Sequence, residues 1–243
     1  MPKFHVNKTQ WLTVCIIALY AKTEYVDYGD GLCYNDDMRS FTLMLILCFA
    51  IFARPAHAQA GDTRWNNPAA RQAALSLARR AFDTYALRRE VLDPPRPLPA
   101  LFQRPAAVFV STMRPDGSPR CCMGSLYPTQ PNAAEEIIAC AVAAAGHDRR
   151  FAPLRPAELP HLVLIVSFVD RPRPITAAEA GRLDPVTEGL AVQNAGRWGV
   201  VLSGETARRE NLPLWGRTRA GAGPNAPVQY FRIHDVRMKE AAL

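Results

Sequence analysis

The sequence predicts an α+β fold in which a mixed or mainly antiparallel sheet is flanked by helices. Alanine-rich segments at 68–89 and 132–145 place apolar residues at helical spacing. Two β-prone runs surround a Pro-Asp-Gly-Ser turn at 115–118, which favours a β-hairpin. Residues 162–169 are almost all apolar, as is typical of a strand covered on both faces.

The two helices have recognisable ends. Asn67 precedes Pro68, which places a capping residue before a proline at the first helical position. Asn132 is followed three residues later by Glu135, the spacing of a capping box, and Gly146 is expected to end the second helix.

The hairpin strands are expected at 106–113 and 119–126. The remaining predicted elements are a short helical turn at 157–159, a break at 171–174, helical segments at 177–183 and 206–219, and strands at 199–202 and 228–236.

A secretory signal is predicted at residues 38–58. It has a short charged start at Met38, an apolar run at 41–52 and an Ala-His-Ala cleavage site at 56–58. The apolar run is shorter than the about 20 residues that span a bilayer, so cleavage after Ala58 is favoured over a retained membrane anchor.

The rest of the chain is expected to form a single domain. Because a signal peptide begins at the true N-terminus, residues 1–37 are interpreted as an over-extended start. Cleavage leaves a polar leader at 59–67 and one domain at 68–243, without a membrane span. The protein is therefore expected in the periplasm or outside the cell.

Composition argues against several classes of protein. The formal net charge is +7, but the arginines are not confined to one stripe and are not interleaved with aromatic residues, so nucleic-acid binding is not predicted. The abundant arginine suits contacts with carboxylates or phosphates and also follows from a GC-rich genome. No C-x-x-C or His-x-x-x-His spacing occurs after residue 58, and neither a metal nor a cofactor is predicted.

Three cysteines follow the predicted cleavage site: Cys121, Cys122 and Cys140. An odd number does not form a disulfide framework. In an oxidising compartment Cys140 is able to pair with Cys121 or Cys122, and this alternative stays open.

A series of motifs follows in order. P-R-C-C-M-G at 119–124 precedes the alanine-rich helix, and Asp-Arg-Arg-Phe at 148–151 comes next, followed by a proline-rich stretch at 153–159 and the apolar strand. The order resembles the AMMECR domain family, also known as AmmeMemoRadiSam system protein A. Its members typically show L-R-G-C-I-G, an alanine-rich helix, a D-x-R-F loop and a Pro-rich E-E-L-type stretch. The resemblance covers roughly residues 68–238.

This resemblance implies a single α+β domain of two lobes, with the cysteine strand near a cleft between them. It implies no established activity. Cys121 stands where the family usually has glycine; if that glycine lets a ligand approach closely, Cys121 narrows the space.

Cys122 takes the family's cysteine position and is the candidate catalytic residue. Because side chains alternate along a strand, Arg120, Cys122 and Gly124 are expected on one face, opposite Cys121 and Met123. The two adjacent thiols then point apart.

The candidate ligand- or anion-binding residues are Arg120, Gly124, Asp148 and Arg150. Asp148 and Arg150 equally suit a bracing ion pair within their loop. His147 is considered as a base for Cys122, which requires hydrogen-bond distance.

Two functions are carried forward. The first is an exported binding module for a small molecule or protein segment, with an Arg/Cys-lined cleft. The second is an enzyme that uses Cys122 on an anionic or acyl-type small molecule, which requires a thiolate. Against the second stands the possibility that Cys122 is a buried packing residue.

We predict that translation starts at Met38 and that the mature chain begins at Gln59. Peptide mapping of the precursor and N-terminal sequencing of the mature protein test both statements. A peptide from residues 1–37 in the precursor would contradict the predicted start.

Overall fold

The computed structural model describes residues 63–241. The chain divides into two units, Met1–His57 and Ala58–Leu243, and the described residues lie in the second. The predicted start and signal peptide fall outside them, as does the first part of the 59–67 leader. Within the described range, no helix has the length and apolar character needed to cross a membrane.

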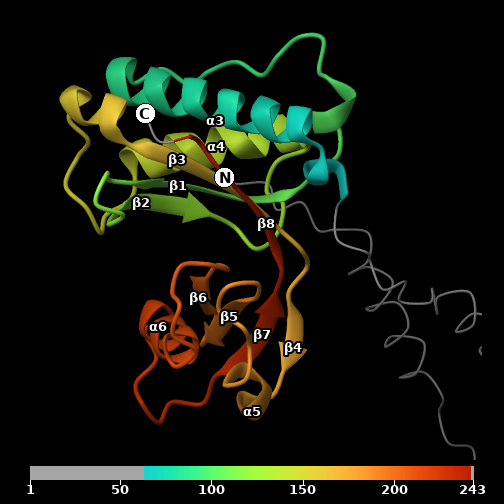
Figure 1. The fold of residues 1–243 in the computed structure, drawn as a ribbon, viewed down its shortest axis with the longest axis vertical. Coiled ribbons are helices and arrows are strands. Elements are labelled where there is room, and N and C mark those ends of the chain that lie inside the picture. Colours follow the sequence, from blue (N-terminus) through green and yellow to red (C-terminus); the bar gives the residue numbers. More distant parts are fainter. Residues whose placement is uncertain (1–62, 242–243) are drawn as a thin grey trace, which may run out of the picture. The chain divides into compact units, whose positions relative to one another are not determined.

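The described residues form two four-stranded antiparallel sheets together with helices, which confirms the α+β class (Figure 1). The first sheet contains β1 (Ala107–Met113), β2 (Pro119–Gly124), β3 (Val163–Val169) and β8 (Asp235–Lys239), in the order β2-β1-β3-β8. The second contains β4 (Arg173–Ile175), β5 (Gly189–Asn194), β6 (Arg197–Val201) and β7 (Gln229–Ile233), in the order β4-β7-β5-β6.

The longest helices, α3 (Pro68–Arg88) and α4 (Ala133–Gly146), lie side by side over one face of the first sheet (Figure 1). The second sheet carries α6 (Asn211–Arg219), which packs on β5 and β6. The shorter elements are α5 (Ala177–Ala180) and the 3₁₀ helices η1 (Thr63–Asn66), η2 (Ala100–Phe102) and η3 (Pro156–His161).

The predicted helix starts are confirmed. The Asn67 side chain accepts a hydrogen bond from the Ala69 N–H at 2.8 Å, and the Asn132 side chain accepts one from the Glu135 N–H at 3.0 Å. Gly146 differs from the prediction, because it is the last helical residue rather than the residue after the end. A Cβ there would collide with the ring of Tyr85 on α3, so this glycine permits the close contact of the two helices.

Alternation along the first sheet separates two cores. Val108 and Val110 of β1 face α3 and α4 in the helix-side core, where the rings of Trp65 and Phe168 stack at 3.6 Å. The opposite side chains face the second sheet. They contribute to an inter-sheet cluster, which consists of Ala107, Phe109, Leu126, Val169, Ala191, Leu202 and Ile233. The predicted burial of β3 on both faces is thereby confirmed.

The predicted closing strand at 228–236 is two strands in different sheets. The chain leaves the second sheet after β7, passes His234 and enters the first sheet as β8. The only other crossing in the described part joins β3 to β4, and there the Asp170 N–H donates to the His234 carbonyl at 2.9 Å. No turn residue marks the change of sheet, so the sequence pattern alone reads as one strand.

Two further strands depart from the prediction. The break expected at 171–174 contains part of β4, where Pro174 is tolerated because β4 is an edge strand. The interior strand β5 was not predicted. It begins at Gly189, where a Cβ would approach the Val201 carbonyl oxygen at 2.8 Å.

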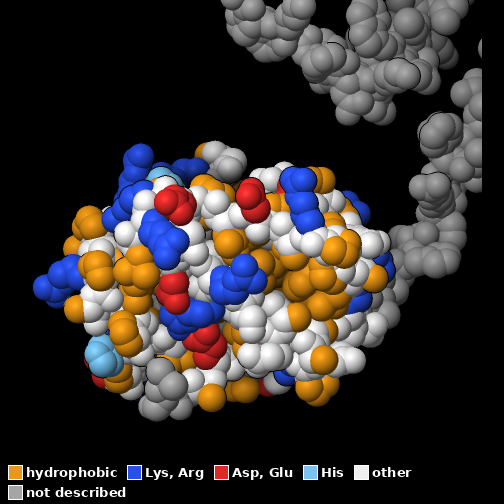
Figure 2. Space-filling view, turned by 90° about the horizontal axis from the view of Figure 1, so that it is seen from above, with side chains coloured by type: hydrophobic (Ala, Val, Ile, Leu, Met, Phe, Trp, Pro, Cys, Tyr) orange, Lys and Arg blue, Asp and Glu red, His pale blue; other side chains and the backbone are white. Residues whose placement is uncertain are grey.

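The outer surface over α3 is of mixed character. Figure 2 shows basic, acidic and apolar side chains interspersed on this face rather than collected into one basic stripe.

We predict that Gly199→Ala lowers the free energy of unfolding by about 3 kcal/mol, near the upper end for an overpacked core. Gly199 of β6 lies against the backbone of α6, where an added Cβ would collide with the Gly216 carbonyl and the Ala220 N–H. Urea unfolding measures the change. Gly223→Ala is the matched control, because no atom lies within 4 Å of the added Cβ; equal stability of the two variants would contradict the predicted contact.

Candidate functional site

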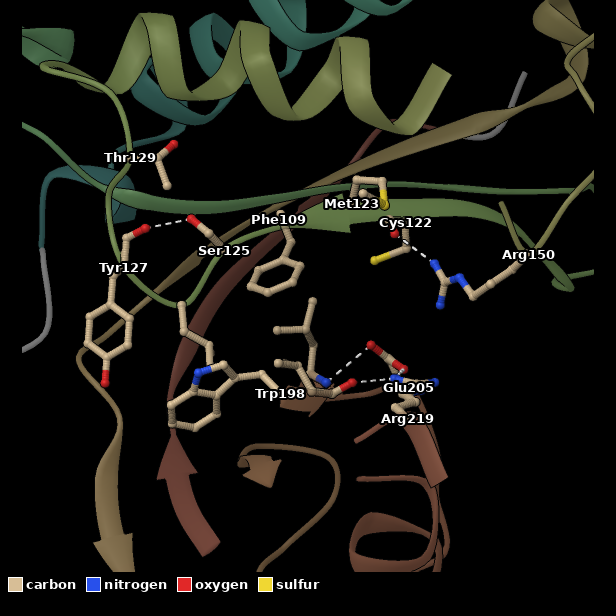
Figure 3. Close-up of a pocket in the computed structure, with 14 residues that line it drawn as sticks. Phe109, Cys122, Met123, Ser125, Tyr127, Thr129, Arg150, Trp198, Glu205 and Arg219 are labelled. Carbon is tan, nitrogen blue, oxygen red and sulfur yellow. Dashed lines mark hydrogen bonds and ion pairs between the residues drawn. The ribbon is translucent and has the colours of Figure 1, made fainter. Parts of the chain in front are cut away.

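A pocket of about 520 Å³ lies between the two sheets, next to the inter-sheet cluster (Figure 3). The side formed by the first sheet contains Phe109 of β1, Cys122, Met123 and Gly124 of β2, the following loop with Ser125, Leu126, Tyr127 and Thr129, and Arg150. The opposite side contains Trp198 and Val200 of β6, with Leu202, Glu205 and Arg219.

The middle of the pocket is apolar and aromatic. Figure 3 shows Phe109 above Trp198, with Tyr127 at one end. Trp198 packs on Phe231 with ring centroids 5.1 Å apart, and Tyr127 meets it edge-on at 6.4 Å. These aromatic contacts hold Trp198 in place without filling the pocket, so a flat apolar ligand finds a preformed surface.

One buried carboxylate shapes the pocket wall. Glu136 of α4 accepts hydrogen bonds from the Thr129 N–H and the Gln130 N–H, each at 2.7 Å, and from the Ser125 hydroxyl at 3.1 Å. The sequence accounts for Glu136 as a helix-start residue. Its position shows a second role, because these bonds fix the loop that presents Tyr127 to the pocket.

The two adjacent cysteines point to opposite faces of β2, as predicted. Cys122 lines the pocket, and its Sγ accepts a hydrogen bond from the Ser111 hydroxyl at 3.0 Å. Cys121 belongs to the helix-side core, with its Sγ 2.9 Å from the Thr112 hydroxyl. Cys121 therefore does not narrow the pocket, contrary to the expectation from the family's glycine. Both thiols and that of Cys140 are free.

The pocket does not activate the Cys122 thiol. Burial raises the pKa of Cys122, and this effect exceeds the opposing effects of the Ser111 hydrogen bond and of Arg150 and Arg219. Glu205 adds to the increase. The thiol is therefore protonated at neutral pH, whereas a cysteine nucleophile reacts as the thiolate.

Asp148 and Arg150 brace the free edge of β2. The Cys122 N–H donates to Asp148 Oδ2 at 2.8 Å, and Arg150 Nη2 donates to the Cys122 carbonyl at 2.7 Å. Arg150 Nε also donates to Asp148 Oδ1 at 2.8 Å. Burial raises the pKa of Asp148, but the hydrogen bonds from Arg150 and Cys122 outweigh it and leave that pKa below its ordinary value. The pair thus takes the place of a neighbouring strand, while Arg150 still lines the pocket.

A similar pair, which no sequence motif indicates, occupies the edge of β6. The Leu202 N–H donates to Glu205 Oε1 at 3.1 Å, and Arg219 Nη1 donates to the Val200 carbonyl and to Glu205 Oε2. Glu205 and Arg219 lie 14 residues apart and share no local motif. Trp198 was missed for the same reason, since only the folded second sheet brings it to the pocket.

Arg120 is placed differently from the prediction. Thr112 of β1 pairs with Cys121, and the next residue, Met113, pairs with Pro119. Arg120 is therefore the extra residue of a β-bulge, and the alternation of side chains between the two faces of β2 is broken there. Its side chain is 4% exposed and lies outside the pocket lining.

The Arg120 guanidinium serves the fold. Its Nε donates to Glu158 Oε1 at 2.9 Å, and Nη2 donates to the Ala152 carbonyl at 2.9 Å. The hydrogen bond from Arg120 lowers the pKa of Glu158 to about 2.

The other predicted residues are placed as follows. Gly124 lines the pocket, and a Cβ there would collide with the Val108 carbonyl and with Phe109. His147 lies outside the pocket lining, with Nε2 at 3.2 Å from the Tyr85 hydroxyl, so the structure does not pair it with Cys122. In residues 63–241, no group of three or more His, Cys, Asp and Glu side chains is arranged to hold a metal ion.

Comparison with known proteins identifies relatives of this chain. The model of the AMMECR1 family matches residues 75–211. A Thermotoga maritima protein is 38% identical over 129 residues, a match that spans 53% of this chain and 73% of the relative. A Thermococcus gammatolerans protein is 33% identical over 135 residues, spanning 53% and 65%.

The fold is also shared with a solved structure. The crystal structure of an uncharacterized protein from Pyrococcus horikoshii superposes with a TM-score of 0.65 at 23% identity, covering 72% of this chain and 93% of that protein. The family match includes Cys122, Arg150 and Glu205, but Arg219 lies beyond its end.

We predict that Cys122 reacts slowly with iodoacetamide at neutral pH and titrates above the ordinary thiol pKa of about 8.5. Burial raises its pKa, and Ser111→Ala is expected to raise it further, because the hydroxyl no longer donates to the sulfur. Peptide mass spectrometry across a pH series measures both. The denatured chain is the control and should return the ordinary value; a titration below about 8.5 in the folded protein would contradict the protonated thiol.

Proposed function

Because this chain belongs to the AMMECR1 family and builds a largely apolar pocket between its two sheets, we propose that it is a binding module for a small molecule. The observation that carries the proposal is the pocket itself. Its volume of about 520 Å³ lies in the range of ligand-binding sites, and a few polar groups lie at the ends of its apolar middle part. Such groups orient a ligand that the apolar surface holds.

The state of Cys122 favours binding over catalysis. An enzyme acting through Cys122 on an anionic or acyl-type substrate requires the thiol to lose its proton to a nearby base. The Ser111 hydroxyl donates a hydrogen bond to the Cys122 sulfur, and burial holds the thiol in its protonated form. Cys122 is thus proposed to be a contact surface of the pocket.

We also propose that the module acts after export. The charged start, apolar run and Ala-His-Ala site at residues 38–58 support a cleavable signal peptide. The ligand then comes from the periplasm or from outside the cell.

We predict that uncharged naphthalene-2-acetamide binds in the pocket. It is expected to shift the indole N–H resonance of Trp198 in ¹H–¹⁵N NMR spectra. Trp198→Ala, in which binding is followed by the backbone amide resonances of Met123 and Gly124 in the pocket wall, should weaken binding about tenfold, because loss of an aromatic contact removes roughly 1.5 kcal/mol. Cys122→Ser should leave the affinity within about twofold, since it changes one atom on the pocket wall.

Leu87→Ala is the control, because Leu87 is an exposed apolar residue outside the pocket lining. Binding that survives Trp198→Ala unchanged would contradict the proposed site. Rapid acetylation of Cys122 by p-nitrophenyl acetate at neutral pH, without binding of the naphthyl probe, would favour the enzyme.

A further inference from the structure

Two arginines line one end of the pocket, and they come from opposite sides of it. Arg150 follows α4 on the side of the first sheet, and Arg219 is the last residue of α6 on the second. In Figure 3, Arg150 lies beside Cys122 at this end of the pocket, and Arg219 and Glu205 lie below it.

Both guanidinium groups are held in position before any ligand binds. Arg150 is fixed by the carbonyl of Cys122 and by Asp148, and Arg219 by the carbonyl of Val200 and by Glu205. The Arg219 guanidinium also lies over the Trp215 ring, 5.7 Å from its centroid. Because main-chain groups are among the anchors, the arginines lose little further conformational freedom on binding.

A count of donors and acceptors shows what the pocket end offers. A guanidinium always carries its charge and has five N–H donors. Arg150 engages Nε and Nη2, and Arg219 engages Nη1. Within residues 63–241, Nη1 of Arg150 and both Nε and Nη2 of Arg219 donate to no oxygen atom, and the Cys122 thiol also interacts with Arg150.

The neighbouring carboxylates do not accept hydrogen bonds from these remaining N–H donors. Asp148 already accepts from the Cys122 N–H and from Arg150, and Glu205 accepts from the Leu202 N–H and from Arg219. The end of the pocket therefore has more donors than acceptors. A ligand group rich in acceptor oxygens satisfies it, whereas a cationic group does not.

On this basis, we propose that the pocket selects ligands with an oxyanion, a carboxylate or a phosphate, on an apolar body. The oxyanion lies between Arg150 and Arg219, and the body lies against Phe109 and Trp198. Planar guanidinium groups match the geometry of both kinds of oxyanion, and charge-assisted hydrogen bonds are stronger than neutral ones. The inference rests on the proposed function, since it names the ligand class of the same pocket.

The experiment compares ligands that differ at one end. Naphthalene-2-acetate, naphthalene-2-acetamide and 2-naphthyl phosphate are titrated into the ¹⁵N-labelled protein, and dissociation constants are taken from the shifts at Trp198. We expect the acetate to bind at least about tenfold more tightly than the amide, the effect of one or two charge-assisted hydrogen bonds. A phosphate that binds more tightly than the acetate identifies a phosphate ester as the preferred form of oxyanion.

Arginine variants locate the preference. Arg219→Gln and Arg150→Gln are each expected to reduce the ratio of acetate to amide affinity to within about threefold. Arg149→Gln is the matched control, because Arg149 is the exposed neighbour of Arg150 and lies outside the pocket lining. Arg150→Gln removes a contact with β2 and is therefore the variant more exposed to a folding defect, which its amide spectrum reveals. In that case Arg219→Gln alone decides the test.

The outcomes separate the two proposals. If acetate and amide bind equally well and both shift Trp198, the oxyanion preference is wrong while the binding pocket stands. If the acetate is preferred but both arginine variants retain the preference, the placement of the oxyanion is wrong. If none of the three probes shifts Trp198 at millimolar concentration, both the pocket function and the ligand class are wrong.

Discussion

Two neighbouring segments carry the chain from one sheet to the other, and the hydrogen bond between Asp170 and His234 joins them at the crossing. Further bonds tie β8 of the first sheet to the loop after β6 of the second. Asp235 accepts from the Ser203 N–H at 3.0 Å, and Arg237 donates to the Ser203 carbonyl at 3.0 Å. These contacts bring the sheets together next to the inter-sheet cluster, so the pocket forms where side chains of the two sheets face each other without filling the space.

The two edge strands that border the pocket are completed by side chains. Exposed ion pairs alone contribute little to stability, but a main-chain N–H or carbonyl without a partner is unfavourable when water is excluded. The Asp148–Arg150 pair satisfies both groups of Cys122, and Arg219 satisfies the carbonyl of Val200. The same contacts block the addition of another strand and orient the guanidinium groups toward the pocket. On our proposal, protection of an edge and recognition of an anion are two consequences of one arrangement.

The parts of the site that the sequence predicts are formed by residues close together in the chain, and the parts that it does not predict are formed by residues far apart in the chain. The helix starts, the hairpin and the opposite orientation of the adjacent thiols depend on neighbouring residues, and the sequence predicts them correctly. Cys122 and Arg150 lie in consecutive motifs, whereas Trp198 and Arg219 reach the pocket only through the folding of the second sheet. Arg120 was misplaced because a bulge, which has no sequence signal here, interrupts the alternation of β2. The pairing of strands from two sheets is a long-range property that local patterns do not encode.

The protonation state of Cys122 bears directly on the arginine pair. A thiolate in this position would itself be an anion near Arg150 and Arg219, both of which lower the pKa of the thiol. It would compete with a ligand for the guanidinium donors. Burial outweighs the two arginines, so the sulfur stays neutral, and the N–H donors that Asp148 and Glu205 leave unoccupied remain available to an external oxyanion. A pocket suited to binding anions through these arginines therefore requires a cysteine that is not activated, which explains how an arginine-lined thiol is compatible with a binding module.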